Sequence, residues 1–214
     1  VIIAMKRFPR VSVKEEGAPL EKGVLGHLLR EWRFMSAVVA QFFYVGAQVA
    51  VFSYMIRYAQ ATMPGTSGKV AANYITAGLL AFMAGRFAGA ALMKYLRPAH
   101  VLATFAIINI ALAAFAAFAP GHFGIYALVA SSFFMSIMYP TIFALGVEGK
   151  GDTERKFGAS LLVMAIVGGA VVTAAMGATS DHLGIALAML VPMVCFLAIF
   201  LFAWGRMRHA GSPA

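Results

Sequence analysis

The chain is poor in charged residues and has a single cysteine. Only 12% of its 214 residues are charged and 62% are hydrophobic, with a mean hydropathy of +0.84. A soluble domain of this length needs far more polar surface to cover its core, so a soluble fold is excluded. The one cysteine, Cys195, lies in an apolar run, which excludes a disulfide framework and a cysteine-based metal cluster within the chain.

Acidic residues are scarcer than basic ones. Eight Asp and Glu stand against 17 Lys and Arg, which gives a formal net charge of +9. In a soluble protein this excess would suggest nucleic-acid binding. Here the basic residues fall mainly in short connections between apolar runs, where they act as topology signals. We therefore expect a lipid bilayer around the protein and no nucleic-acid partner.

Long apolar runs make up most of the chain. A helix needs about 20 apolar residues to cross the hydrocarbon core. Six runs qualify, at 34–57, 71–94, 101–119, 124–147, 157–178 and 185–205. Short breaks rich in Pro, Gly and charge separate them, and none alternates apolar and polar residues as a strand would. The sequence predicts an all-α integral membrane protein with six transmembrane helices.

The charge distribution predicts four parts and an orientation. Residues 1–5 have the character of the end of a preceding transmembrane helix, 6–33 of a cytoplasmic linker, 34–205 of a six-helix transmembrane domain and 206–214 of a cytoplasmic tail. Lys and Arg gather in the linker, in the second and fourth connections and in the tail, whereas the opposite side carries only Lys69 and, at a span end, Arg57. This asymmetry predicts a multi-pass protein of the inner (cytoplasmic) membrane with its C-terminus in the cytoplasm.

The first residues favour a longer parent protein. "VIIAM" followed by "KRFPR" has the pattern of a helix leaving the membrane, and it is too short for the apolar region of a signal peptide. We favour the second half of a twelve-span protein, joined through a central cytoplasmic loop. The alternative is a self-contained six-span protein with a hydrophobic start.

Acidic residues are absent from all six predicted spans, and the five histidines fall in linkers or loops. Proton-coupled transporters usually carry the proton on an intramembrane carboxylate or histidine, so a proton carrier is expected in the missing half. The sequence has no set of nucleophile, base and orienting group and no metal-ligand spacing. We therefore expect no enzyme activity, no metal site and no cofactor.

Uncharged polar side chains form stripes on three of the predicted helices. The stripes are Gln41, Tyr44 and Gln48; Asn73 and Thr76; and Ser132, Ser136 and Tyr139. Amides and hydroxyls beside aromatic rings suit a sugar, whose hydroxyls need donors and acceptors and whose ring stacks on aromatics. The alternative is hydrogen bonding that only joins helices, worth about 0.6 kcal/mol per contact. We favour a cavity for the first stripe and leave the serines open.

Arg57 and Arg86 are the costly residues of the spans, and Arg57 lies near the outer boundary, where its charge can reach the interface. Arg86 lies deep in the second span, where an arginine costs about 2.5–3.5 kcal/mol. We expect it to pair with backbone carbonyls or an acidic loop residue near the cytoplasmic end, and our hypothesis is that it gates the inner mouth. Pro140 removes a backbone hydrogen bond in the fourth span and predicts a kink there.

Small residues form two further faces, at which helix backbones are expected to approach closely. These faces are Gly78, Gly85 and Gly89 in the second span, and Ala165, Gly169, Thr173 and Gly177 in the fifth. Packing is the interpretation we favour for both, although tightly packed helices of this kind can also slide during a transport cycle.

Four segments resemble one transporter family, in order along the chain. They are "AQFFYVGAQVAVFSYMIRYA" (40–59), "AANYITAGLLAFMAGRFAGAALMKYLRPAHVLA" (71–103), "FMSIMYPTIFALGVEG" (134–149) and "GASLLVMAIVGGAVVTAAMGATSDHLG" (158–184). They are similar to helices of the second half of the fucose permeases, in the fucose–galactose–proton branch of the major facilitator superfamily.

The resemblance implies the C-terminal half of a twelve-helix major-facilitator fold, with alternating access around a midplane sugar site and the N-terminal six-helix half as its partner. It implies that L-fucose or a related hexose moves together with protons, whose coupling carboxylates lie in the missing half. Tyr44, Gln48, Asn73 and Tyr139 match cavity-facing polar positions. A facilitator for glucose, galactose or another polyol, and a non-transporting six-span scaffold or gene remnant, remain open alternatives.

Overall fold

The computed structural model describes residues 22–210, so the predicted helix end at 1–5 and most of the predicted linker lie outside the described part. In chain order its elements are α1 (Lys22–Arg30), α2 (Trp32–Thr62), α3 (Gly68–Leu92), α4 (Pro98–Phe118), α5 (His122–Met135), α6 (Met138–Val147), α7 (Asp152–Met164), a 3₁₀ turn η1 (Ala165–Val167), α8 (Gly168–Leu183), α9 (Ile185–Ala188) and α10 (Leu190–Ala210).

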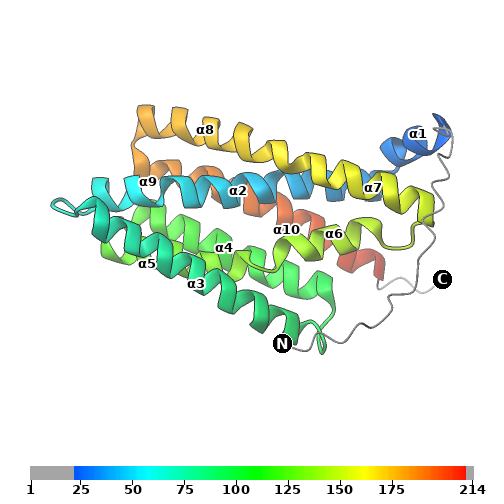
Figure 1. The fold of residues 1–214 in the computed structure, drawn as a ribbon, viewed down its shortest axis with the longest axis horizontal. Helices are drawn as coiled ribbons and strands as arrows, with labels where there is room; N and C mark the ends of the chain where they lie inside the picture. The colour runs from blue at the N-terminus through cyan, green and yellow to red at the C-terminus, as the bar shows by residue number, and fades with distance from the viewer. Residues whose placement is uncertain (1–21, 211–214) are drawn as a thin grey trace, which may run out of the picture.

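Six helical stretches of the described part are long and apolar enough to cross a membrane. α2, α3 and α4 each form one span, and the pairs α5 with α6, α7 with α8, and α9 with α10 form the others. The spans lie side by side along the long axis of the molecule (Figure 1). The all-α architecture with six spans is confirmed. The first span starts at Trp32, inside the predicted linker, and α10 continues into the predicted tail.

Connections alternate between the two ends of the bundle (Figure 1). The α3–α4 and α6–α7 connections, α1 and the end of α10 lie at one end, and the other three connections lie at the opposite end. The first end carries Lys94, Arg97, Lys150 and Arg206, and we call it the basic end. Two ion pairs hold α1 and the start of α2 there, His27 with Glu154 of α7 at 3.2 Å and Glu31 with Lys150.

Small residues bring the spans close together, as their spacing predicted. A Cβ atom added at Gly85 of α3 would overlap the carbonyl oxygen of Phe133 on α5. On the other side of the bundle, a Cβ at Gly169 of α8 would lie 3.1 Å from the side chain of Val49 on α2. The two faces therefore place α3 directly on α5, and α8 directly on α2.

α2 is the central helix of the bundle. It packs against α3, α5, α6, α8 and α10, and its fully buried side chains include Phe34, Tyr44, Met55 and Tyr58. The Tyr58 hydroxyl donates to the carbonyl oxygen of Ala116 on α4 at 2.6 Å, so its polar tip is satisfied inside the apolar interior. Side chains on α2 therefore reach the centre of the bundle, and those near its midpoint build the candidate site.

Candidate functional site

The fourth span is interrupted near its midpoint. α5 ends at Met135 and α6 begins at Met138, within a stretch of 26 residues from His122 to Val147. Proline has no backbone N–H, so Pro140 deprives the carbonyl of Ser136 of its usual helical donor. The regular α-helical hydrogen bonding is interrupted at residues 136–137, one turn before Pro140, where the sequence predicted a kink.

Tyr44 of α2 bridges to this break. Its hydroxyl donates to the carbonyl oxygen of Met135 at 2.9 Å, and the whole side chain is buried. The Tyr44 ring meets the Tyr139 ring edge to face with centroids 6.0 Å apart, and Tyr139 stacks on Phe143 at 6.5 Å. We call Tyr44, Tyr139 and Phe143 the aromatic cluster. Tyr139 and Phe143 are half-buried, so part of each ring is accessible to a ligand.

Two amide side chains flank the cluster on α2. Gln48 is half-buried, whereas Gln41 is fully buried. Neither the oxygen nor the nitrogen of the Gln41 amide has a hydrogen-bond partner within residues 22–210. The Thr173 hydroxyl of α8, the helix that packs on α2, is also buried without a hydrogen-bond partner among the described residues. An unpaired buried polar group costs about 1–3 kcal/mol, and native proteins keep few of them, so a polar ligand or water is expected at Gln41.

Asn73 lies apart from the aromatic cluster. It is exposed in the second turn of α3, close to the end opposite the basic end. Gly89, much further along α3, packs against Ile137 at the break. At about 1.5 Å per residue, about 24 Å of helix separates Asn73 from Gly89. The structure therefore brings Tyr44 and Tyr139 together and leaves Asn73 distant from both.

Arg86 is exposed on α3, and its guanidinium lies over the ring of Phe82, 5.3 Å from the ring centroid. Within residues 22–210 Arg86 makes no contact with a backbone carbonyl or a carboxylate, so its predicted pairing stays a prediction. Phe82 lies one turn earlier on the same helix face and offers its ring to the cation.

The two stripe serines of the fourth span bond to backbone within their own span. The hydroxyls of Ser132 and Ser136 donate to carbonyl oxygens of their own helix, at 3.1 and 2.7 Å. The sequence analysis missed a buried polar pair nearby, in which the Ser131 hydroxyl donates to Asn109 of α4. A lone amide in the apolar run of α4 was the available signal, since such groups usually find a partner on a neighbouring helix.

Comparison with known proteins relates the chain to sugar transporters, although no protein-family model matches it. It is 49% identical over 183 residues to the L-fucose-proton symporter of Escherichia coli (strain K12), covering 85% of this chain and 41% of that protein. It is 31% identical over 210 residues to the L-fucose-proton symporter of Haemophilus influenzae, covering 95% and 48%. A glucose/galactose transporter of Brucella abortus is 34% identical over 195 residues, with 89% and 44% covered.

The fold gives the same relationship. A crystal structure of the E. coli fucose:proton symporter matches with a TM-score of 0.85 at 47% identity, covering 87% of this chain and 45% of that chain. A crystal structure of a major facilitator superfamily transporter, FucP, in the outward conformation matches with a TM-score of 0.84, covering 86% and 45%. The chain therefore spans about half the length of the curated relatives it matches, which agrees with one six-helix half.

Proposed function

The chain is a relative of the L-fucose-proton symporters with the fold of half a major facilitator superfamily transporter, and from this premise we propose that it is the C-terminal half of a proton-coupled sugar transporter. The proposed substrate is a hexose or deoxyhexose, and L-fucose is the sugar we favour. The observation that carries the proposal is the identity with the E. coli symporter across most of the chain.

In the proposed mechanism, this half and the N-terminal six-helix half rock against each other around a sugar held near the midplane. The acidic residues of the described part all lie at the ends of spans or in connections. A proton carried through the membrane centre needs a titratable group there. The half that precedes this chain would therefore carry the proton, while this half contributes sugar contacts and conformational change.

The sugar contacts of this half are proposed at the aromatic cluster. The break in the fourth span supports this position, because it lies near the span midpoint and presents the half-buried rings of Tyr139 and Phe143. Gln48, and the unpaired amide of Gln41, would supply donors and acceptors for sugar hydroxyls. Tyr44 would orient Tyr139, since its own hydroxyl is occupied by the Met135 carbonyl.

Asn73, Arg86 and Pro140 are proposed to act at other stages of the cycle. Asn73, near the end opposite the basic end, would meet the sugar as it enters or leaves. The break before Pro140 would let α5 and α6 tilt separately. Arg86 follows Gly85, which packs directly on Phe133 just before that break. A change at the break would therefore move Arg86, which is how this arginine would gate the inner mouth.

The proposed location is the inner (cytoplasmic) membrane, with the basic end and the C-terminus in the cytoplasm. Support comes from the excess of Lys and Arg at the basic end, since short cytoplasmic connections carry this excess in membrane proteins.

The test is uptake of labelled sugars by cells that express the protein in its longest natural form and lack other permeases. We expect L-fucose to accumulate and a protonophore to abolish the accumulation. If glucose or galactose enters and the protonophore has no effect, the protein is a facilitator. If no sugar enters although the protein reaches the membrane, the scaffold alternative replaces the proposal.

A further inference from the structure

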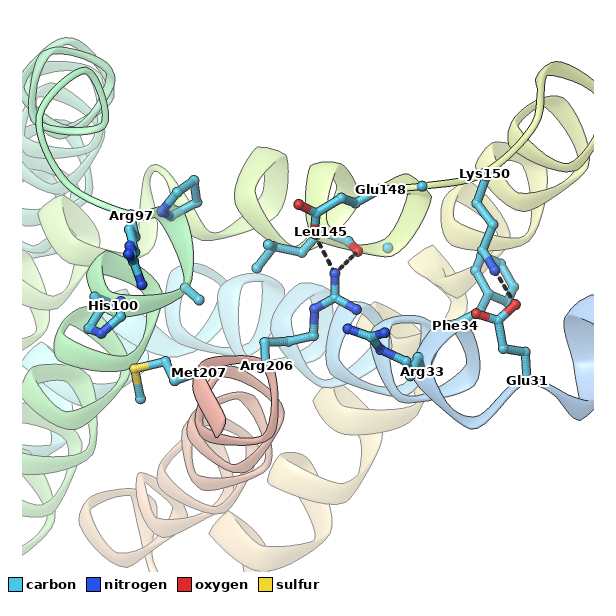
Figure 2. A pocket seen from close by; sticks show the side chains of 14 residues that line it. Glu31, Arg33, Phe34, Arg97, His100, Leu145, Glu148, Lys150, Arg206 and Met207 are labelled. Atoms are coloured by element: carbon cyan, nitrogen blue, oxygen red, sulfur yellow. Dashed lines mark hydrogen bonds and ion pairs between the residues drawn. The ribbon is translucent and has the colours of Figure 1, made fainter. Parts of the chain in front are cut away.

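Two hollows open at the basic end, on either side of Arg33 and Arg206. The first, of about 460 Å³, lies between α2, α4, α6 and α10 and has charged side chains of both signs among apolar ones in its lining (Figure 2). The second, of about 330 Å³, is a groove between the start of α2 and the end of α10 with mainly apolar walls. Both arginines line both hollows, so charged and apolar space adjoin at one pair of guanidinium groups.

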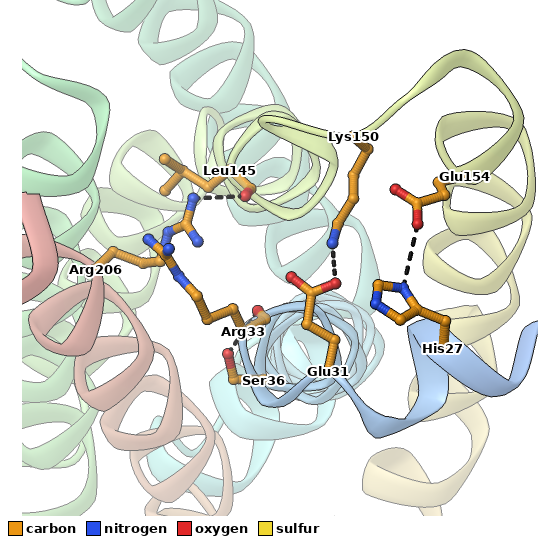
Figure 3. Close-up of polar contacts among 8 residues, drawn as sticks. All are labelled: His27, Glu31, Arg33, Ser36, Leu145, Lys150, Glu154 and Arg206. Carbon is orange, nitrogen blue, oxygen red and sulfur yellow. Dashed lines mark hydrogen bonds and ion pairs between the residues drawn. The ribbon is translucent and has the colours of Figure 1, made fainter. Parts of the chain in front are cut away.

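The charged hollow holds more cations than its carboxylates neutralise. Its two carboxylates are already paired, Glu31 with Lys150 (Figures 2 and 3) and Glu148 with Arg206 (Figure 2). Within residues 22–210, no carboxylate pairs with Arg33. Both close-up views place the Arg33 guanidinium beside that of Arg206. Of these two adjacent guanidinium groups only that of Arg206 has a carboxylate partner, which leaves a positive charge for an anion from outside.

Arg206 is held in a fixed position at this junction. One terminal nitrogen donates to the carbonyl oxygen of Leu145 at 2.9 Å and to the Glu148 carboxylate, and only 12% of the side chain is exposed. An arginine has five N–H donors, so donors remain for a further acceptor. A phosphate group, with several acceptor oxygens, suits a guanidinium pair better than it suits lysines.

The groove beside the arginines offers room for an apolar chain. Its floor and walls are Val39 and Ala40 of α2 and Ala198, Leu201 and Phe202 of α10. Trp32 stands at its mouth and is 81% exposed, as expected of a tryptophan at a membrane interface. From Trp32 to Ala40 the groove follows about 12 Å of helix at about 1.5 Å per residue. Gly205 borders open space in this groove, since a Cβ atom there would meet nothing within 4 Å.

We propose that this groove binds an anionic phospholipid, with the phosphate at Arg33 and Arg206 and an acyl chain along α2 and α10. Basic pockets between transmembrane helices bind anionic headgroups in this manner. The occupant has to be both anionic and apolar, because the charged and the apolar space meet at the same two side chains. A neutral sugar satisfies neither condition, so this site is separate from the aromatic cluster and independent of the transport proposal.

The test is native mass spectrometry of the protein, in the length in which it is purified from its membrane, titrated with phosphatidylglycerol and phosphatidylethanolamine of identical acyl chains. Phosphatidylglycerol should bind at least about fivefold more tightly, since one basic residue near an anionic headgroup contributes about that factor. Arg33→Gln should weaken phosphatidylglycerol binding about fivefold. It should weaken phosphatidylethanolamine binding less, because the ammonium group of that lipid already offsets the charge of its phosphate.

Two further variants separate the contribution of the arginine charge from that of the groove's shape to lipid binding. Arg155→Gln removes an exposed arginine of α7 that lines neither hollow, and binding of both lipids should stay unchanged. Gly205→Leu fills the groove without changing the charge, so it should weaken the binding of both lipids to a similar extent.

Four results would overturn the lipid site. They are equal affinities for the two lipids, an effect of Arg155→Gln as large as that of Arg33→Gln, displacement of phosphatidylglycerol by glycerol phosphate at similar concentration, and no binding of either lipid. The third would identify a site for soluble anions. The fourth would mean that another protein segment covers the groove.

Discussion

Two spans that pack on α2 are interrupted near their middle, and the causes differ. In the fourth span, Pro140 follows a break at residues 136–137, where the regular α-helical hydrogen bonding is interrupted. In the fifth span, α7 and α8 continue almost in line through the 3₁₀ turn η1 (Figure 1). No proline lies at that turn; Gly168 follows it, and a Cβ there would overlap the carbonyl oxygen of Phe42 on α2. The interruption of the fourth span frees backbone carbonyls from helical hydrogen bonding, whereas that of the fifth span brings α8 into contact with the backbone of α2.

The difference shows what each interruption offers. At the break of the fourth span, a tyrosine hydroxyl from α2 binds a backbone carbonyl, and aromatic rings are left half-buried around it. At the turn of the fifth span, backbone and side-chain contact fills the space and leaves little for a ligand. A ligand site is therefore expected at the first interruption and rigid packing at the second.

The largest effect on stability is expected at the tight contact of the fifth span. Gly168→Val would push a side chain into the backbone of α2, and overpacking of this kind costs about 1–3 kcal/mol. The melting temperature in detergent should fall clearly. Gly205→Ala, where the added carbon meets nothing, is the matched control and should melt like the parent. Equal melting of the two variants would remove the packing explanation.

The next largest effect is expected on sugar binding at the broken span. Tyr139→Ala removes the central ring of the aromatic cluster and should weaken L-fucose affinity by about tenfold, equivalent to about 1.4 kcal/mol. Tyr126→Ala is the control, since Tyr126 also lies on this span in an edge-to-face pair, with Tyr74 at 6.1 Å. Equilibrium binding measures both. Equal losses of L-fucose affinity in the two variants would mean that the sugar does not bind at the aromatic cluster.

A smaller effect should follow from the bond that bridges the break. Tyr44→Phe leaves the Met135 carbonyl without its donor and should cost about 1 kcal/mol in stability, measured as a lower melting temperature. Tyr54→Phe on the same helix is the control, because its hydroxyl makes no hydrogen bond within the described residues. A Tyr44→Phe variant that melts no lower than this control would mean that the bond contributes little.

The smallest change in stability is expected at Gln41. Replacing its unpaired amide in Gln41→Leu removes a buried polar group without breaking a hydrogen bond to any described residue, so the melting temperature should stay equal or rise. Affinity for L-fucose should fall if the amide binds the sugar, by about fivefold for one lost hydrogen bond of ~1 kcal/mol. Unchanged affinity would leave Gln41 outside the sugar site.

The sequence was sufficient to predict the six spans and one of the two interruptions. Hydropathy gave the six spans because lipid demands about 20 apolar residues per crossing, and Pro140 predicted its break because proline cannot donate. The turn at η1 was not predicted, since it depends on how closely Gly168 approaches Phe42, a tertiary contact that leaves no mark in the spacing of apolar residues.

The candidate site was predicted less completely. The stripe of Gln41, Tyr44 and Gln48 lies on the face of α2 that was predicted. Helical periodicity does not tell which of the three side chains finds a hydrogen-bond partner, as Tyr44 does, and which remains unpaired, as Gln41 does. Asn73 was grouped with Tyr139 by the family resemblance, although their positions along their spans put them far apart. The contact of Arg86 with Phe82 was not predicted, because only carbonyls and carboxylates were considered as partners and a ring one turn away on the same helix was left out.

The most direct test of the central claim is the external pH of a lightly buffered suspension of cells that express the protein in its longest natural form. Protons that enter together with a sugar leave the medium more alkaline. We predict a prompt alkaline shift when L-fucose is added, absent in cells without the protein and abolished by a protonophore. Entry of labelled L-fucose with no change in pH would contradict proton coupling, and no entry at all would contradict transport.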